Sequence, residues 1–308
     1  YLSISENLFE KTHLETKKLI TRLYTNVLLA KYNILNLENN KVSLEANFVE
    51  VHQRFRNGFE EEESVEQIQL TLAQTNSALK YAKNILELER NMLKFVIGFP
   101  IEAPLVLSEE LDAIFNEEQY LQNLPDARDY GNNIDIKIAE NNVKAEALLL
   151  KLEKSKSLPK VNAFINRTYT GNSNDFTFAD SDQKWYGSSL LGLNVKIPIF
   201  SSLGRNASTQ KAKISLEQAI TTLEETQAKI SIEIKAAQNE FQLSIDNYFT
   251  EKENLRLAER IEQKNQTKFY EGMVQSFELR MAQVQLYSAQ KTFVNAIQNV
   301  INNKLTLE

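Results

Sequence analysis

The stretch LPKVNAFINRTYTGN, residues 158–172, alternates apolar and polar side chains in the middle of a chain whose other long segments follow helical periods. One parity is apolar and the other is polar: Val161, Ala163, Ile165 and Tyr169 against Asn162, Asn166 and Thr168. Successive side chains of a β-strand point to opposite faces, so the pattern predicts a strand with one apolar and one polar face. Whatever covers the apolar face decides the fold class.

A second stretch, SSLLGLNVKIPIF at 188–200, repeats the alternation after the polar loop GNSNDFTFADSDQK at 171–184. The two strands form either a hairpin on a soluble core or a hairpin of a transmembrane β-barrel, in which one face meets lipid and the other meets the lumen. In a barrel, the lipid-facing residues are Val161, Ile165, Leu191, Leu193, Val195 and Ile197, and the lumen-facing ones are Asn162, Asn166, Asn194 and Lys196. The aromatic residues Tyr169, Trp185 and Tyr186 then form an interfacial girdle, or otherwise a soluble aromatic cluster.

The flanking segments favour the barrel, because they predict long helical rods and no globular core. A heptad of apolar residues, typical of a left-handed coiled coil, runs through 64–98 at Val65, Leu72, Leu79, Leu86 and Leu93. When the sequence is shifted by the separation of Gly58 from Gly272, the apolar positions of two segments coincide, which predicts a duplicated helical hairpin. No Gly or Pro occurs within 206–265, and a helix of that length spans about 90 Å.

These patterns divide the chain into five segments. They are a helical hairpin of a first repeat (1–98), a connector with one short helix (99–126), the first helix of a second repeat (127–157), the β-hairpin (158–200) and the helical hairpin of the second repeat (201–308). The expected fold class is mainly α, with long antiparallel coiled-coil hairpins and a β-hairpin that contributes strands to a membrane barrel.

Composition argues against several other functions. The chain has no cysteine, and its two histidines have no metal-ligand spacing, so we expect no metal site and no cofactor. It has no nucleophile elbow and no phosphate-binding glycine loop, so we expect no catalytic residues and no enzyme activity. A net charge of −6 without a basic patch argues against nucleic acid as a partner.

Five motifs occur in a fixed order along the chain. They are NNIDIKIAENNVKAEALLLKLEKSKSLP at 132–159, LPKV at 158–161, IPIF at 197–200, LGR at 203–205 and FYEGMVQSFELRMAQVQLYSAQ at 269–290. Together they resemble the TolC-type outer-membrane efflux protein family. The resemblance implies a homotrimer that closes a shared β-barrel in the outer membrane of a Gram-negative bacterium and extends a helical tunnel, an α-barrel, into the periplasm. It implies a passive duct for efflux or secretion, fed by an inner-membrane transporter through a periplasmic adaptor protein.

The resemblance also implies roles for residues near the two glycine turns. Glu278 falls where the family carries a pore-narrowing acid, and Met281 stands where a second acid can occur. The expected surface for adaptor docking consists of the turn residues Gly58, Glu60, Glu61, Gly272 and Ser276. An ordinary alternative for all three acids is a solvated position at a helix start, where the helix dipole favours negative charge. The nearby Arg54, Arg56 and Arg280 are candidates to pair with the acids of 60–63, either within one protomer or between protomers.

Two further expectations follow from the pattern. The first repeat has no clear strand pair of its own, so we expect the missing strands to precede Tyr1. The alternative to a channel is a soluble coiled-coil scaffold or adaptor protein that binds partners along its helices.

Overall fold

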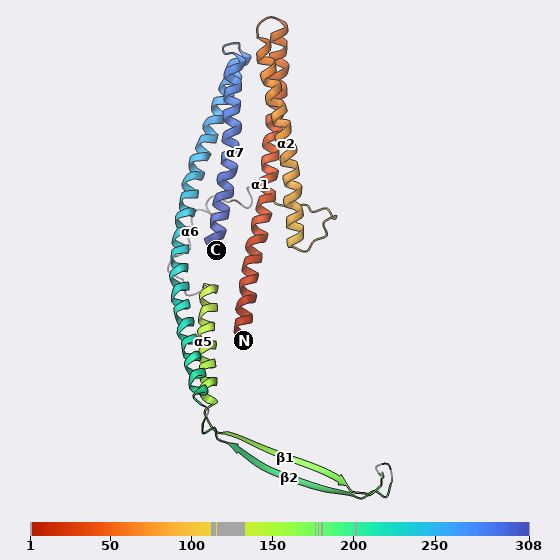
Figure 1. Cartoon of the computed structure of the whole chain (residues 1–308). Helices are drawn as coiled ribbons and strands as arrows, with labels where there is room; N and C mark the ends of the chain where they lie inside the picture. Colours follow the sequence, from red (N-terminus) through yellow and green to blue (C-terminus); the bar gives the residue numbers. More distant parts are fainter. Residues whose placement is uncertain are drawn as a thin grey trace. The chain divides into compact units, whose positions relative to one another are not determined.

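The structure, a computed structural model, describes residues 2–111, 115, 133–175, 177, 179, 181–200 and 202–307. In chain order its elements are α1 (Leu2–Arg56), α2 (Glu62–Val96), α5 (Ile134–Ser155), β1 (Lys160–Gly171), β2 (Trp185–Lys196), α6 (Gly204–Tyr270) and α7 (Ser276–Leu307), as Figure 1 shows. The chain is mainly helical with one two-stranded antiparallel sheet, which confirms the predicted fold class. The short helix expected in the connector falls largely on 112–114 and 116–126, which lie outside the described residues.

The chain divides into two compact units. Unit 1 comprises residues 1–8 and 131–228 and contains α5, the β-hairpin and the start of α6. Unit 2 comprises residues 9–130 and 229–308 and contains most of α1, all of α2 and α7, and the rest of α6. No helix among the described residues is both long enough and apolar enough to cross a membrane.

The long helices end where a glycine permits a left-handed backbone. α6 runs for 67 residues without a glycine or proline after its first residue, so the predicted rod is confirmed. Gly272 then takes φ +75°, and Gly58 takes φ +77° after α1. At both ends the amide beyond the glycine donates to the carbonyl five residues back: Phe59 N to Arg54 O at 2.9 Å, and Met273 N to Lys268 O at 2.8 Å. This Schellman arrangement requires a positive φ, which glycine adopts without a Cβ clash.

The two helical hairpins repeat each other. Residues 57–61 separate α1 from α2, and residues 271–275, at the same offset as the two glycines, separate α6 from α7. Apolar positions that the offset aligns are buried in both copies, since Val27 and its counterpart Phe241 are both 0% exposed. The two hairpins therefore share the turn position and the packing seam that the predicted duplication requires.

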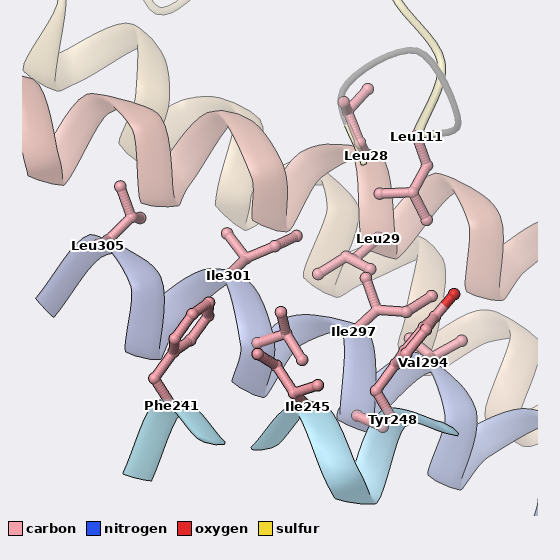
Figure 2. Packing of buried hydrophobic residues seen from close by; sticks show 12 residues of the cluster. Leu28, Leu29, Leu111, Phe241, Ile245, Tyr248, Val294, Ile297, Ile301 and Leu305 are labelled. Carbon is pink, nitrogen blue, oxygen red and sulfur yellow. The ribbon is translucent and has the colours of Figure 1, made fainter. Parts of the chain in front are cut away.

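The core of unit 2 is shared between the repeats. Figure 2 shows the largest cluster, which packs Leu28 and Leu29 of α1 and Leu111 with Phe241, Ile245 and Tyr248 of α6 and Val294, Ile297, Ile301 and Leu305 of α7. A second cluster near the turns combines Val51, Val65 and Ile68 of the first repeat with Phe269 and Leu279 of the second. Burying apolar surface contributes about 25 cal/mol per Å². The same burial that closes each hairpin therefore also joins the two hairpins.

The β-hairpin of unit 1 pairs residue for residue. Val161 lies opposite Val195, Ala163 opposite Leu193 and Ile165 opposite Leu191. Residues directly opposite each other in an antiparallel pair share a face, so the apolar parities of both strands form one apolar face, as predicted. This face is not covered by the described chain, because Ile165 is 79% exposed and Leu191 is 78% exposed.

Candidate functional site

A residue of the first turn caps the helix that follows the second turn. Glu60 Oε1 accepts a hydrogen bond from the backbone N–H of Ser276 at 3.2 Å, and Glu60 Oε2 accepts one from the Ser276 hydroxyl at 3.0 Å. Ser276 is the first residue of α7 and is only 6% exposed. The first N–H groups of a helix have no partner within the helix, and the helix dipole favours a carboxylate beside them. Glu60 therefore ties the first repeat to the second where the helices turn.

Arg54 makes a matching contact at the C-terminus of α6. Its Nη2 donates to the backbone carbonyl of Phe269 at 2.8 Å, and its guanidinium carbon lies 4.2 Å from the centroid of the Phe269 ring. Its Nε donates to Glu50 Oε1 at 2.7 Å, one helical turn earlier in α1. Within the described chain Arg54 therefore pairs with Glu50 and not with the acids of 60–63, because the helical i, i+4 spacing brings Glu50 beside it. Arg54 and Glu60 together contact both ends of the turn between α6 and α7.

A polar network follows the turns along the helices. Gln283 Nε2 donates to Glu262 Oε1 at 3.4 Å and to Ser43 Oγ at 3.5 Å, so it bridges α6, α7 and α1. Burial raises the pKa of the Glu262 carboxyl above its ordinary value, and the hydrogen bond from Gln283 opposes part of that rise. Burial, with the nearby Glu262 charge, raises the pKa of the Tyr287 hydroxyl, which donates to the Asn40 carbonyl at 3.4 Å. Glu262 is thus a carboxyl whose ionised form the fold disfavours.

Amide side chains line a groove of about 560 Å³ between α1, α2 and α7. Two amide pairs join α1 to α7 along this groove: Gln298 Nε2 donates to Asn26 Oδ1 at 3.2 Å, and Asn40 Nδ2 donates to Gln290 Oε1 at 2.7 Å. Hydrogen bonds are directional where apolar contacts are not, so these pairs fix the register between the two repeats.

The predicted pore residues are exposed on the first turns of α7. Glu278 and Met281 are three residues apart, so they lie near each other on one side of the helix, and both are exposed. The Arg280 guanidinium lies 5.2 Å from the centroid of the Phe277 ring, so it contacts a residue of the same helix, α7. In the part of the chain that the structure describes, no cluster of three or more acidic or histidine side chains could hold a metal ion.

The turns expose the predicted docking residue Glu61 and three apolar residues that the sequence did not single out. Glu61 is the N-cap residue of α2, but its side chain makes no capping bond, and it is exposed. Phe59, Met273 and Phe277 are large apolar residues at or just after the turns, and all three are exposed. The structure therefore brings Glu60 and Ser276 together and leaves Glu61 outside that contact.

The aromatic residues of the hairpin divide between its two faces. Tyr169, opposite Gly187, and Trp185, opposite Gly171, lie on the apolar face. Tyr186 lies opposite Thr170 on the other, mainly polar face.

Two kinds of comparison identify relatives of the chain, while no curated protein is similar enough to count as a match. Residues 130–308, more than half of the chain, match the model of a family described as outer membrane efflux protein. The chain is 17% identical to the outer membrane protein VceC of Vibrio cholerae, with a TM-score of 0.78 over 99% of this chain and 72% of that one. It is 18% identical to the transmembrane channel CusC, with a TM-score of 0.83 over 99% and 70% of the two chains. It is 17% identical to the outer membrane channel MtrE of Neisseria gonorrhoeae in its open state, with a TM-score of 0.81 over 99% and 67%. At these identities the likeness establishes the fold.

Proposed function

Because the chain belongs to the outer membrane efflux protein family, we propose that it is one subunit of a trimeric channel through which an inner-membrane transporter exports its substrates. The family places the protein in the outer membrane of a Gram-negative bacterium and makes it a transport duct rather than an enzyme. It implies a trimer within a tripartite efflux system. The homotrimer, a periplasmic adaptor protein and the inner-membrane transporter as partners belong to the proposal.

One observation carries the proposal: the hairpin has a mainly apolar face that no described residue covers, interrupted only near the loop by Arg167 opposite Ser189. Both strands have 12 residues, and a membrane-spanning strand needs about 9–11. On the lipid side lie Val161, Ile165, Leu191, Leu193, Val195 and Ile197, the last just beyond β2. Open strand edges are not tolerated in lipid, so strands of neighbouring subunits complete the barrel. Tyr169 and Trp185 lie on the lipid side at the loop end of the hairpin, where the interfacial girdle is expected, whereas Tyr186 lies at the same end on the polar face.

The long helices supply the tunnel that continues from the barrel. Rods such as α6 have no compact globule to enclose, and the paired hairpins form a curved wall when copies stand around an axis. We assign the turn end to the far mouth of the duct. Glu278, repeated by threefold symmetry, then attracts cations at a constriction that Met281 narrows further with an apolar side chain.

We assign adaptor docking to the turns, with Gly58, Glu60, Glu61, Gly272 and Ser276 as their backbone and polar part. The exposed Phe59 and Met273 support this assignment, because clustered apolar side chains on a surface indicate a protein contact. Glu60 is held by Ser276, whereas Glu61 is available to a basic partner residue. The soluble scaffold alternative has no comparable support, because it leaves the apolar hairpin face without a cover.

The test of the proposed channel measures ion conduction through the purified protein. The protein, extracted from outer membranes with detergent, is sized gently and then inserted into planar bilayers. We expect trimers and stable single-channel conductance, with reduced cation selectivity in Glu278→Gln and unchanged selectivity in Glu259→Gln, an exposed acid of α6. A detergent-independent monomer without conductance would refute the channel. Conductance with unchanged selectivity in Glu278→Gln would refute only the pore assignment.

A further inference from the structure

Two lysines face each other at the open end of the hairpin. Lys160 opens β1 and Lys196 closes β2, and they are direct partners in the register. Direct partners place their Cβ atoms about 5 Å apart on one face of the sheet. The adjoining pair on that face is Asn162 with Asn194, so the lysines lie on the polar face and not on the lipid side.

The surroundings do not neutralise these charges. Neither strand contains Asp or Glu, and the acids of the hairpin lie at its other end, in the loop, at Asp175, Asp180 and Asp182. Within the described residues, neither lysine takes part in an ion pair. Both side chains are exposed. Like charges directly opposite each other in a sheet destabilise it, so hairpin folding gives no reason for this pair.

We propose that Lys160 and Lys196, repeated around the channel axis, form a positively charged ring that binds and selects anionic solutes where the helical duct meets the barrel. The proposal rests on the proposed function, because the polar face meets the lumen only in a closed barrel. Rings of Lys or Arg side chains are the usual device for anion selectivity in pores. Lys160 and Lys196 repel each other in the isolated hairpin. In the ring, a multivalent anion on the axis is attracted by every lysine at once, so the same charges form a binding site.

The site has a defined direction along the duct. Lysines lie at the root of the hairpin and aspartates in its loop, so a solute leaving through the barrel passes from positive to negative potential. An anion is attracted to the lysines at the root and repelled by the aspartates of the loop, so the root is the favoured position for an anion along the hairpin. The chain as a whole carries a net charge of −6, so general electrostatics does not predict anion binding.

The experiment measures block of single-channel current by inorganic tripolyphosphate at low salt. The test variant is Lys160→Gln with Lys196→Gln. The matched control is Lys235→Gln with Lys264→Gln, which removes the same charge from exposed positions of α6. We expect tripolyphosphate to block the wild type and the control, and the test variant to need a roughly tenfold or higher concentration. Wild-type block should fade as KCl rises from about 0.1 M to 1 M, because the Debye length falls from about 10 Å to 3 Å.

A charge-reversing variant separates binding from folding. Lys160→Glu with Lys196 retained creates an opposite-charge pair, which should raise the thermal stability of the protein while weakening block by tripolyphosphate. A purely structural role of the lysines predicts that stability and block change together. Equal block of the wild type and the double glutamine variant, or block that is insensitive to salt, would overturn the proposal. A protein without trimers or conductance would instead overturn the proposed function.

Discussion

Replacing Glu60 with alanine tests whether the first turn holds the second repeat in place. The change removes both hydrogen bonds to Ser276 and leaves its backbone N–H and hydroxyl without their acceptor at a position that is 6% exposed. Losing a helix cap costs about 1 kcal/mol, and losing the carboxylate beside the helix dipole adds roughly 0.3–1 kcal/mol. We therefore expect the free energy of unfolding to fall by about 1.5 kcal/mol.

Thermal unfolding in detergent, followed by circular dichroism at 222 nm (the helical band), measures the effect. For a chain of this size about 1.5 kcal/mol corresponds to a melting temperature lower by roughly 2–3 °C. The matched control is Glu61→Ala, which removes an adjacent acid that makes no capping bond and should cost less than about 0.5 kcal/mol.

A double-mutant cycle with Ser276→Ala isolates the pair itself. If the two side chains interact as the distances indicate, the coupling energy is about 1 kcal/mol, because either single variant already loses the hydroxyl bond and the double variant loses little more than Glu60→Ala alone. Additive costs, within about 0.5 kcal/mol, would show that Glu60 and Ser276 act independently and would refute the reasoning.

Three further changes test other contacts in unit 2. Arg54→Ala should cost roughly 1–3 kcal/mol in thermal unfolding, because it removes a charged donor from the Phe269 carbonyl, which then keeps only the Gly272 N–H, and loses the contact with the Phe269 ring. Arg56→Ala should have little effect. Gly272→Ala should cost roughly 1 kcal/mol because the φ of Gly272 is +75°. The control Gly204→Ala, at the start of α6, should be neutral or stabilising, because φ is not positive there and nothing lies within 4 Å of an added Cβ. Glu262→Gln should raise the melting temperature at pH 7. The folded state raises the pKa of Glu262, so the ionised carboxylate opposes folding at pH 7. This penalty is absent below the pKa of the unfolded state, so the substitution should raise the melting temperature less at pH 4. Equal rises in melting temperature at pH 4 and pH 7 would contradict a buried, disfavoured carboxylate at Glu262.

Much of the fold was accessible from the sequence because its signals are periodic. The heptad from Val65 to Leu93 predicts a helix, and so does the absence of glycine within 206–265. The alternation around Val161 predicts a strand. Gly58 and Gly272 marked the turns because only glycine adopts their φ without strain. These features are local, so neighbouring residues alone determine them.

The contacts between the repeats were not accessible in the same way. Glu60 and Arg54 bind atoms of the second repeat more than two hundred positions away, and nothing in the local sequence distinguishes Glu60 from Glu61. The pairing of Lys160 with Lys196 depended on the hairpin register, which the loop composition does not fix.

The most direct test of the account is a spin-label scan along β1. The chain contains no cysteine, so single cysteines at positions 161 to 166 can each be labelled without a background signal. In lipid vesicles, electron paramagnetic resonance compares the accessibility of each label to oxygen, which concentrates in lipid, and to a water-soluble nickel chelate. The account predicts an alternation in which labels at Val161 and Ile165 favour oxygen and labels at Asn162 and Asn166 favour the chelate. Equal access of the nickel chelate to both parities would place the apolar face in water and contradict the membrane barrel.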